Sequence, residues 1–227
     1  MDREESYRII HKVFGTRPYW TPMPFNLRKY RDRFPVLFRE LGFTEGAELG
    51  VFNGEFSVAL CEDNPKLHLY GIDFWSEYNR RTQETQDTRY EKCCERLGHY
   101  NVTLIREATF DAVRHFEVGQ LDFIYIDAGH TFDECILDLV LWSKVVRDGG
   151  IIALHDYHLT GDVGTAVEAY VRAHKVERWF KTAERYPSVF WIHERRENEA
   201  INSYLSSRRL GDVAEATGTF REDGFTR

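Results

Sequence analysis

The feature that most constrains the fold is the stretch 121–157, LDFIYIDAGHTFDECILDLVLWSKVVRDGGIIALHDY. An apolar strand, a polar loop, a helical pattern, a glycine turn and a second apolar strand follow one another, which predicts a βαβ unit. Asp127 and His130 follow the first strand, and His155 and Asp156 follow the second. Neighbouring parallel strands would bring these side chains to one carboxyl edge of the sheet, where open α/β sheets bind ligands. We therefore expect the functional site at this edge.

The same alternation of strand and helix patterns continues outside this stretch. It predicts an α/β fold with a doubly wound, mostly parallel seven-stranded sheet, whose last two strands form an antiparallel pair. Thr131 and Glu134 have the spacing of a capping box at a helix start. Strands are expected at 46–52, 67–75, 101–108, 121–127, 151–155, 176–182 and 188–194, and helices at 54–63, in the later part of 76–97, and at 109–117, 131–146 and 163–173.

An N-terminal helical appendage is expected over residues 1–43, ahead of the α/β domain. Helices are predicted at 3–14 and 27–41, and Pro35 is expected to bend the second. The segment 17–26 contains three prolines and three aromatic residues, so it cannot be helical. It would form either a substrate lid or a connector whose rings enter the core.

The α/β domain itself is expected to cover residues 44–194. The remaining residues, 195–227, are charged and contain glycine, which indicates a short helix followed by a tail. A contact in a homo-oligomer is the alternative for this last region.

The overall charge and apolar pattern exclude several classes of protein. A formal net charge of −7 argues against a broad nucleic-acid surface. The sequence contains no apolar run of the roughly 20 residues that span a bilayer, and the polar start lacks a signal-peptide pattern. Four cysteines without C-x-x-C spacing indicate reduced thiols. We therefore expect a soluble cytoplasmic protein that does not bind membranes.

A glycine-containing segment, ELGVFNG at 48–54, follows the first predicted sheet strand. Gly50 permits a tight turn and close backbone approach, and Gly54 would open a helix whose free N–H groups attract anions. Asp73 ends the next strand, where a carboxylate can accept both hydroxyls of a ribose. Together these residues favour a nucleoside ligand, although a tight loop without a ligand is the alternative for the glycines. The phosphate-loop and dinucleotide fingerprints are absent, which argues against ATP and NAD.

These motifs, in this order, resemble those of class I S-adenosylmethionine-dependent methyltransferases. ELGVFNGEFS resembles their first motif, GIDFW the second, and LDFIYIDAGH and RDGGIIALHD the fourth and fifth, while REA at 106–108 lies where an acid or amide often reaches the adenine. The resemblance covers about residues 44–193 and implies a Rossmann-like methyltransferase fold with S-adenosylmethionine as cofactor. The cofactor-binding residues that it implies are Glu48, Gly50, Phe52, Asn53, Gly54, Asp73, Phe74, Trp75, Glu107, Ala108 and Asp127.

Among the subfamilies, the sequence is most similar to small-molecule and sugar O-methyltransferases. Relatives of the macrolide-sugar enzymes hold Mg²⁺ with an acid after strand four and an acidic pair after strand five, and use a histidine as general base. The resemblance therefore implies Asp127, Asp156 and His155 as metal positions, and His130 with Asp127 as catalytic residues. An imidazole at His155 suits Mg²⁺ less well than oxygen does. Three outcomes stay open: Mn²⁺ binds, His155 faces elsewhere, or no metal binds.

The expected function is methyl transfer to a small hydroxylated molecule, such as a sugar or natural product. The methyl group of a sulfonium is already activated, so the enzyme must align an oxygen nucleophile and remove its proton. Motifs for base-amino or cytosine-carbon methylation are absent, and nucleic-acid acceptors are therefore not expected. The alternatives are a non-catalytic S-adenosylmethionine-binding partner protein, or a metal-dependent hydrolase or oxygenase that uses the Asp/His cluster.

Each residue of this predicted site also has a structural explanation. The acids could cap turns, and the two histidines could satisfy local hydrogen bonds. Asp138 is expected either on the solvated face of its helix or as a partner of the helix dipole. Trp75, Tyr78 and Tyr157 are expected either to line the cleft or to belong to the core.

Overall fold

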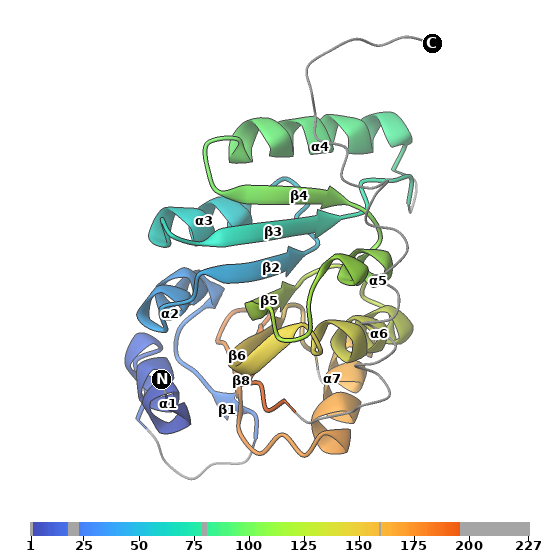
Figure 1. The fold of residues 1–227 in the computed structure, drawn as a ribbon. Coiled ribbons are helices and arrows are strands. Elements are labelled where there is room, and N and C mark those ends of the chain that lie inside the picture. Colours follow the sequence, from blue (N-terminus) through green and yellow to red (C-terminus); the bar gives the residue numbers. More distant parts are fainter. Residues whose placement is uncertain (1, 18–22, 79–80, 159, 196–227) are drawn as a thin grey trace. The chain divides into compact units, whose positions relative to one another are not determined.

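The structure is a computed structural model that describes residues 2–17, 23–78, 81–158 and 160–195. This part of the chain forms one eight-stranded sheet flanked by helices (Figure 1). The strands are β1 (Phe25–Asn26), β2 (Glu45–Leu49), β3 (His68–Asp73), β4 (Val102–Arg106), β5 (Leu121–Ile126), β6 (Val146–Leu154), β7 (Trp179–Lys181) and β8 (Val189–Ile192). The helices are α1 (Arg3–Val13), α2 (Phe34–Glu40), α3 (Glu55–Asp63), α4 (Gln83–Leu97), α5 (Thr109–Ala112), α6 (Phe132–Trp142) and α7 (Asp162–Ala173), with short 3-10 helices η1 (Arg31–Arg33) and η2 (Val113–His115).

The strand order is β1-β7-β8-β6-β5-β2-β3-β4. Strands β6, β5, β2, β3 and β4 are parallel neighbours, whereas β8 runs antiparallel to both β6 and β7. This confirms the doubly wound α/β fold and the closing antiparallel pair. The sheet has one more strand than expected, because β1 pairs in parallel with β7.

Strand β1 comes from the proline-rich segment for which a lid and a connector were both open. Phe25 is buried and pairs with Phe180 across the two strands. This end of the segment is therefore a connector that places its ring in the core. Residues 18–22 of the segment lie outside the described part of the chain, as do the C-terminal helix, tail and oligomer contact expected beyond residue 195.

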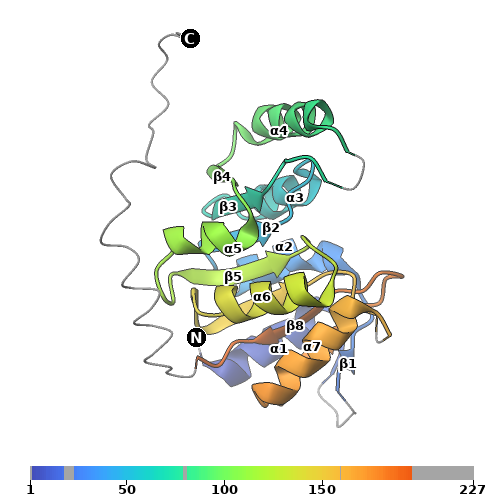
Figure 2. The same cartoon turned by 90° about the vertical axis from the view of Figure 1, so that its right-hand side faces the viewer.

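Helices cover both faces of the sheet, as Figure 2 shows for α5, α6 and α7 on one face. Helices α1, α2 and α3 cover the other face. Strand β5 explains this arrangement, because its side chains alternate between faces. Phe123 and Tyr125 pack under α2 and α3, while Ile124 and Ile126 join the core below α6 and α7. Such a strand is apolar throughout because neither face is exposed to water.

The N-terminal helices belong to the same core as the sheet. The ring of Phe38 in α2 stacks on Phe123 of β5 with centroids 3.9 Å apart, and Phe34 contacts Tyr125 edge-on at 5.4 Å. Each such fully buried side chain contributes roughly 1.5–3 kcal/mol. The described helices of residues 1–43 thus share one hydrophobic core with the sheet.

Two helix boundaries differ from those expected. The helix predicted over 27–41 begins only at Phe34, after η1, and Pro35 lies in its first turn. Proline is tolerated there because first-turn N–H groups have no partner within the helix, so Pro35 does not bend it. The helix expected to reach residue 146 ends at Trp142, because β6 already begins at Val146 and includes the predicted glycine turn with a shift in register.

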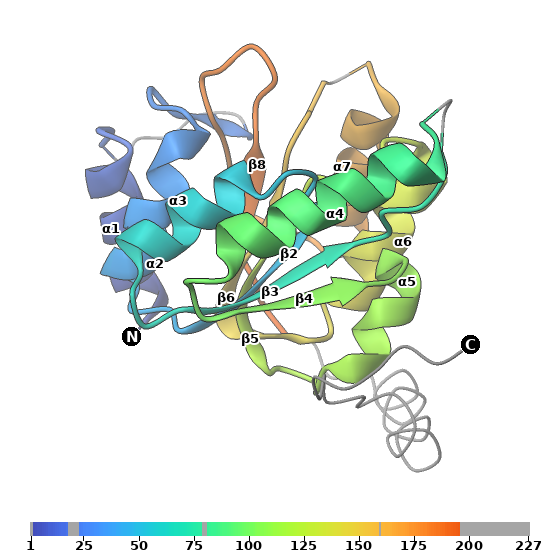
Figure 3. The ribbon, with the colours of Figure 1, turned by 90° about the horizontal axis from the view of Figure 1, so that it is seen from above.

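Several local expectations are confirmed. Thr131 and Glu134 form the predicted capping box at the start of α6. Helix α4 begins late in its segment, at Gln83, and packs its Cys93 and Leu97 against the edge of the sheet beside α3 (Figure 3). Among the described helices, none has the length and apolar character to cross a membrane.

Gly50, directly after β2, lies very close to the backbone at the end of β5. It has a φ of +89°, and a Cβ built on it would lie 2.0 Å from the carbonyl oxygen of Asp127. Gly42 also has a positive φ, of +69°, but a Cβ there would meet no described atom within 4 Å. Substitution of Gly42 by alanine therefore introduces backbone strain alone, whereas substitution of Gly50 introduces backbone strain and a steric collision.

We predict that Gly42→Ala lowers the free energy of unfolding by about 1–2 kcal/mol, the usual cost of a left-handed non-glycine residue. Gly50→Ala should cost at least about 2 kcal/mol more, because backbone atoms of Asp127 must also move. Denaturant unfolding of both variants measures the difference. Equal losses of stability would show that the β2 and β5 ends do not approach each other this closely.

Candidate active site

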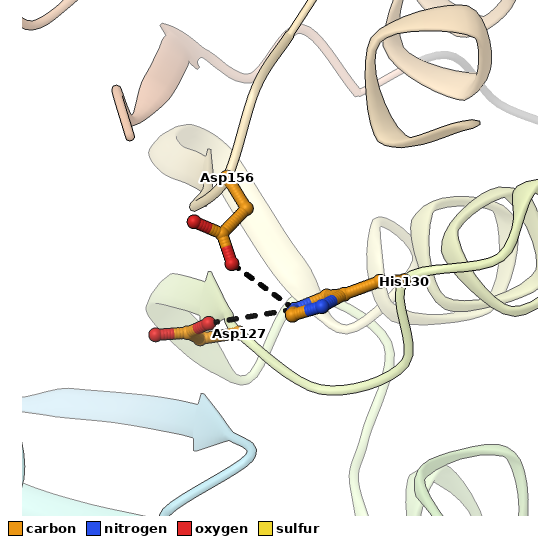
Figure 4. Close-up of side chains that lie close together, drawn as sticks. All are labelled: Asp127, His130 and Asp156. Carbon is orange, nitrogen blue, oxygen red and sulfur yellow. Dashed lines mark ion pairs between the residues drawn. The ribbon is translucent and has the colours of Figure 1, made fainter. Parts of the chain in front are cut away.

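Three polar side chains converge where β5 and β6 end. Figure 4 shows the ring of His130 directed between the carboxylates of Asp127 and Asp156. Its Nε2 lies 3.3 Å from Asp156 Oδ2 and 3.8 Å from Asp127 Oδ1. Each of the three residues offers one ligand atom, and these atoms lie within 4.8 Å of one another. The structure therefore brings the predicted catalytic and metal positions to one edge.

His155 also faces this cluster. Its Nδ1 lies 3.1 Å from Asp156 Oδ1 and 3.5 Å from Asp127 Oδ1, and its side chain is only 13% exposed. This nitrogen is buried but is not aligned for a hydrogen bond with any described group. Of the three outcomes left open by the sequence, the one in which His155 points elsewhere is therefore wrong.

The backbone explains why these side chains meet. The N–H of Asp127 donates to Leu49 at the end of β2, and the N–H of His155 donates to Ile126 at the end of β5. The next residue, Asp156, has a φ of +58°, in the left-handed region that few residues other than glycine, asparagine and aspartate adopt. This turn follows directly from β6 and directs the Asp156 carboxylate toward His130.

A further member of the cluster, Arg31 of η1, was not predicted. Its Nη1 donates to Asp127 Oδ2 at 3.2 Å, and the guanidinium lies over the ring of Phe56, 5.3 Å from the centroid. Its backbone N–H donates to Glu184 Oε1 in the β7–β8 loop. The only signal in the sequence was the abundance of arginine between residues 28 and 39, which does not identify the one that reaches β5.

Opposite charges determine the protonation of the cluster. Burial would raise the pKa of Asp127, but its contacts with His130 and His155 and the charge of Arg31 outweigh burial and hold the pKa well below its usual range. Contact with Asp127 raises the pKa of His130 despite partial burial, and the charge of Asp156 adds to this effect. Asp127 is therefore a carboxylate at all physiological pH values, and His130 holds a proton more tightly than a free histidine.

The loops after β2 and β3 are tied together around Asp73. Asp73 Oδ2 accepts the N–H of Phe52 at 2.8 Å, and Oδ1 accepts the N–H of Trp75 at 3.1 Å. The indole N–H of Trp75 donates in turn to the carbonyl of Phe52. Each carboxylate oxygen retains capacity to accept a further donor. Gly54 follows as the N-cap of α3, with a φ of +78°.

The other predicted cofactor residues lie along the same edge but differ in accessibility. Phe52 and Phe74 are exposed, and the carbonyl of Asn53 accepts from Arg96. Trp75 is only 1% exposed, so of the two alternatives left open for it, the structure shows the core position. Its ring packs against the ring of Tyr90 in α4.

At the end of β4, Glu107 is paired with other side chains. Its carboxylate lies 3.1 Å from His115 Nε2 and 3.2 Å from Arg114 Nη2. Ala108 is the N-cap residue of α5. Their contact with an adenine ring stays a prediction.

Two acids are buried on either side of the sheet. Glu48 is 3% exposed and accepts a hydrogen bond of 2.5 Å from Ser57 Oγ, and burial raises its pKa to about 8. It therefore lies beneath the glycine loop rather than at its surface. Asp138 of α6 is also buried, which corrects the expectation of a solvated side chain, and burial raises its pKa to about 7.

The stretch of the chain that carries this site matches a family model. Residues 47–157, from β2 through the acidic cluster, match a family model described as a methyltransferase domain. No curated protein sequence matches the chain.

Several solved structures share the fold. A protein provisionally described as a caffeoyl-CoA O-methyltransferase from Staphylococcus aureus is 13% identical, with a TM-score of 0.56 over 85% of this chain and 93% of that chain. The O-methyltransferase TomG from Streptomyces achromogenes, involved in tomaymycin synthesis and solved with S-adenosylmethionine, is 14% identical, with a TM-score of 0.53 over 85% and 89%. A protein provisionally described as an rRNA methylase from Clostridium thermocellum is 14% identical, with a TM-score of 0.51 over 72% and 97%. At these identities the likeness establishes the fold and does not select the acceptor.

The matched domain, the order of its motifs and the sheet topology support a class I S-adenosylmethionine-dependent methyltransferase. Its fold is the one that small-molecule O-methyltransferases also use.

We predict that Glu48→Gln changes how stability depends on pH. Glu48 has a folded pKa of about 8 against a reference value of 4.5, so the folded state favours its protonated form. The stability from this group is complete below pH ~4.5 and is lost as the pH rises through ~8. The glutamine variant lacks this loss, so its melting temperature relative to the wild type should increase between pH 5 and pH 8.

Thermal unfolding at several pH values measures this difference. Glu55→Gln, at the exposed first residue of α3, is the control and should show no such trend. A constant difference between Glu48→Gln and wild type across this range would mean that Glu48 is ionised in the folded protein.

Proposed function

We propose that the protein transfers a methyl group from S-adenosylmethionine to a hydroxyl oxygen of a small molecule, such as a sugar or natural product. The observation that carries this proposal is the cluster of Asp127, His130 and Asp156 beside the glycine loop. Strand β2 lies between β3 and β5, so the ends that carry Asp73 and Asp127 flank the loop on both sides. A donor held by the loop and Asp73 would present its methyl group toward the cluster.

His130 is the proposed general base. Its side chain is 54% exposed, so an acceptor hydroxyl can approach the ring from solvent, while Asp127 and Asp156 hold the ring in place. The carboxylates favour the imidazolium that forms when His130 takes the hydroxyl proton. The leaving group needs no acid, because the sulfonium departs as a neutral thioether.

The donor set also fits a divalent cation. Asp127, Asp156 and His155 are the proposed ligands, and the buried Nδ1 of His155 without a hydrogen bond supports this assignment. Two carboxylates with one imidazole suit Mn²⁺ at least as well as Mg²⁺. Such an ion would lower the pKa of the acceptor hydroxyl and fix its position. With His155 as the ligand, His130 remains free for the proton.

On the donor side, Asp73 is proposed to accept the ribose hydroxyls, since both of its oxygens are oriented by backbone N–H groups. The loop residues Gly50 to Gly54 are proposed to follow the methionine part of the cofactor. The acidic net charge favours a small-molecule acceptor over nucleic acid. We further propose that the protein is cytoplasmic and forms a homo-oligomer.

We predict that Asp73→Ala weakens S-adenosylmethionine binding by about 10- to 100-fold, because charge-assisted hydrogen bonds to the ribose are lost. Isothermal titration calorimetry measures the dissociation constant. Asp111→Ala, at an exposed acid of α5, should bind as the wild type does. Absence of any binding heat from wild type with either the cofactor or its demethylated product would refute the proposed function.

We further predict that His130→Gln lowers methyl transfer by about 10²- to 10⁴-fold, the usual contribution of a general base, while cofactor binding stays intact. Incubation of a metabolite extract with a deuterated methyl donor, followed by mass spectrometry, identifies the acceptor and gives the rate. His99→Gln, at an exposed histidine after α4, serves as the control. Normal cofactor binding without transfer in the wild type would favour a non-catalytic S-adenosylmethionine-binding protein.

A further inference from the structure

Arg31 brings a fixed positive charge to the acidic cluster from outside the methyltransferase domain. Its guanidinium contacts Asp127 Oδ2, whereas His130 and His155 approach Oδ1 of the same carboxylate. The two oxygens of Asp127 are therefore divided between two sides, with Arg31 on one and the histidines on the other. Among the described residues, Arg31 is the one arginine or lysine paired with Asp127.

The position of Arg31 is supported from several elements. Its backbone N–H is held by Glu184 of the β7–β8 loop, and its guanidinium lies over Phe56 of α3. Burial would lower the pKa of the Arg31 guanidinium, but Tyr125 of β5 and Asp127 raise it. Its side chain is 38% exposed, which leaves it half shielded from water. A contact made from three directions indicates a positioned group rather than a surface arginine that happens to reach an acid.

We infer that Arg31 is a positioning residue that holds Asp127 Oδ2 and limits the affinity of the cluster for a divalent cation. The inference rests on the metal site proposed above. A carboxylate that is already paired with a guanidinium offers less negative charge to a second cation, and the two positive charges repel each other. The cluster without Arg31 would hold two carboxylates with only histidines as partners, and would bind a divalent ion more tightly.

This arrangement has a functional consequence. A cluster that binds its ion weakly on its own retains it best when an acceptor oxygen completes the coordination. Arg31 also keeps Oδ1 directed to the side on which His130 lies, so the base and the ligand oxygen remain on the same side. The N-terminal segment thereby contributes a charge to a site whose other members all lie in the segments that follow β5 and β6.

The test measures Mn²⁺ binding to the whole chain. Electron paramagnetic resonance at fixed ionic strength detects the bound ion. Arg31→Gln should bind Mn²⁺ roughly tenfold or more tightly than the wild type, because even a partly screened repulsion at short range exceeds thermal energy. Arg31→Lys keeps the charge and should remain close to the wild type. Arg39→Gln removes a cation of the same N-terminal region, one paired with Asp63, and should have no effect.

A gain of affinity is a result that simple loss of structure does not produce, and thermal unfolding of each variant checks the fold. The gain should disappear when Asp127→Asn is added to Arg31→Gln. Unchanged or weaker Mn²⁺ binding by Arg31→Gln, or none at all, overturns the inference. Titration of the same samples with S-adenosylmethionine separates this result from a failure of the proposed function, which would appear as absent cofactor binding in the wild type.

Discussion

The close contact between the ends of β2 and β5 is the constraint on which the site depends. The chain leaves β2 at Gly50 so near to the backbone of Asp127 that no side chain fits between them. The N–H of Asp127 donates to Leu49, and that of Gly50 donates to Ile72 at the end of β3. These hydrogen bonds thus hold the ends of β2, β3 and β5 side by side. The glycine loop and the acidic cluster are neighbours because of this backbone packing, whatever ligand they bind.

The second constraint is electrostatic. Asp127 and Asp156 are carboxylates close to one another at the end of adjacent strands, and like charges in a partly buried position are costly unless they are balanced. His130, His155 and Arg31 supply the balance from three directions. The arrangement resembles neither a simple ion pair nor a fully formed metal cage. It is a cluster whose charge can be completed by a ligand.

Much of this could be predicted from local sequence. The alternation of apolar strands with helices predicts the parallel sheet, and the acids and histidines at strand ends predict which side chains meet, because parallel strands share a carboxyl edge. The capping box at Thr131 was equally readable, since it depends on residues only three apart. The orientation of His155 could not be predicted, because it depends on the turn at Asp156 with its positive φ.

Features that depend on distant packing were missed. Arg31 reaches Asp127 only because α2 packs on β5 and the β7–β8 loop holds the backbone of η1. The burial of Asp138 follows from neighbours that no short motif encodes, and the same is true of the core position of Trp75, which the sequence left as one of two alternatives. A sequence pattern shows where polar residues follow the strands. Which distant side chain reaches them depends on tertiary contacts.

The stacking of Phe38 on Phe123 therefore has a meaning beyond stability. The same short segment that inserts aromatic rings beneath β5 also delivers a guanidinium to the carboxylate at its end. Replacement of this N-terminal segment would alter the charge at the acidic cluster together with the aromatic packing beneath β5. A change in this segment is consequently a change in the charge beside Asp127 and not merely a change in how the sheet is covered.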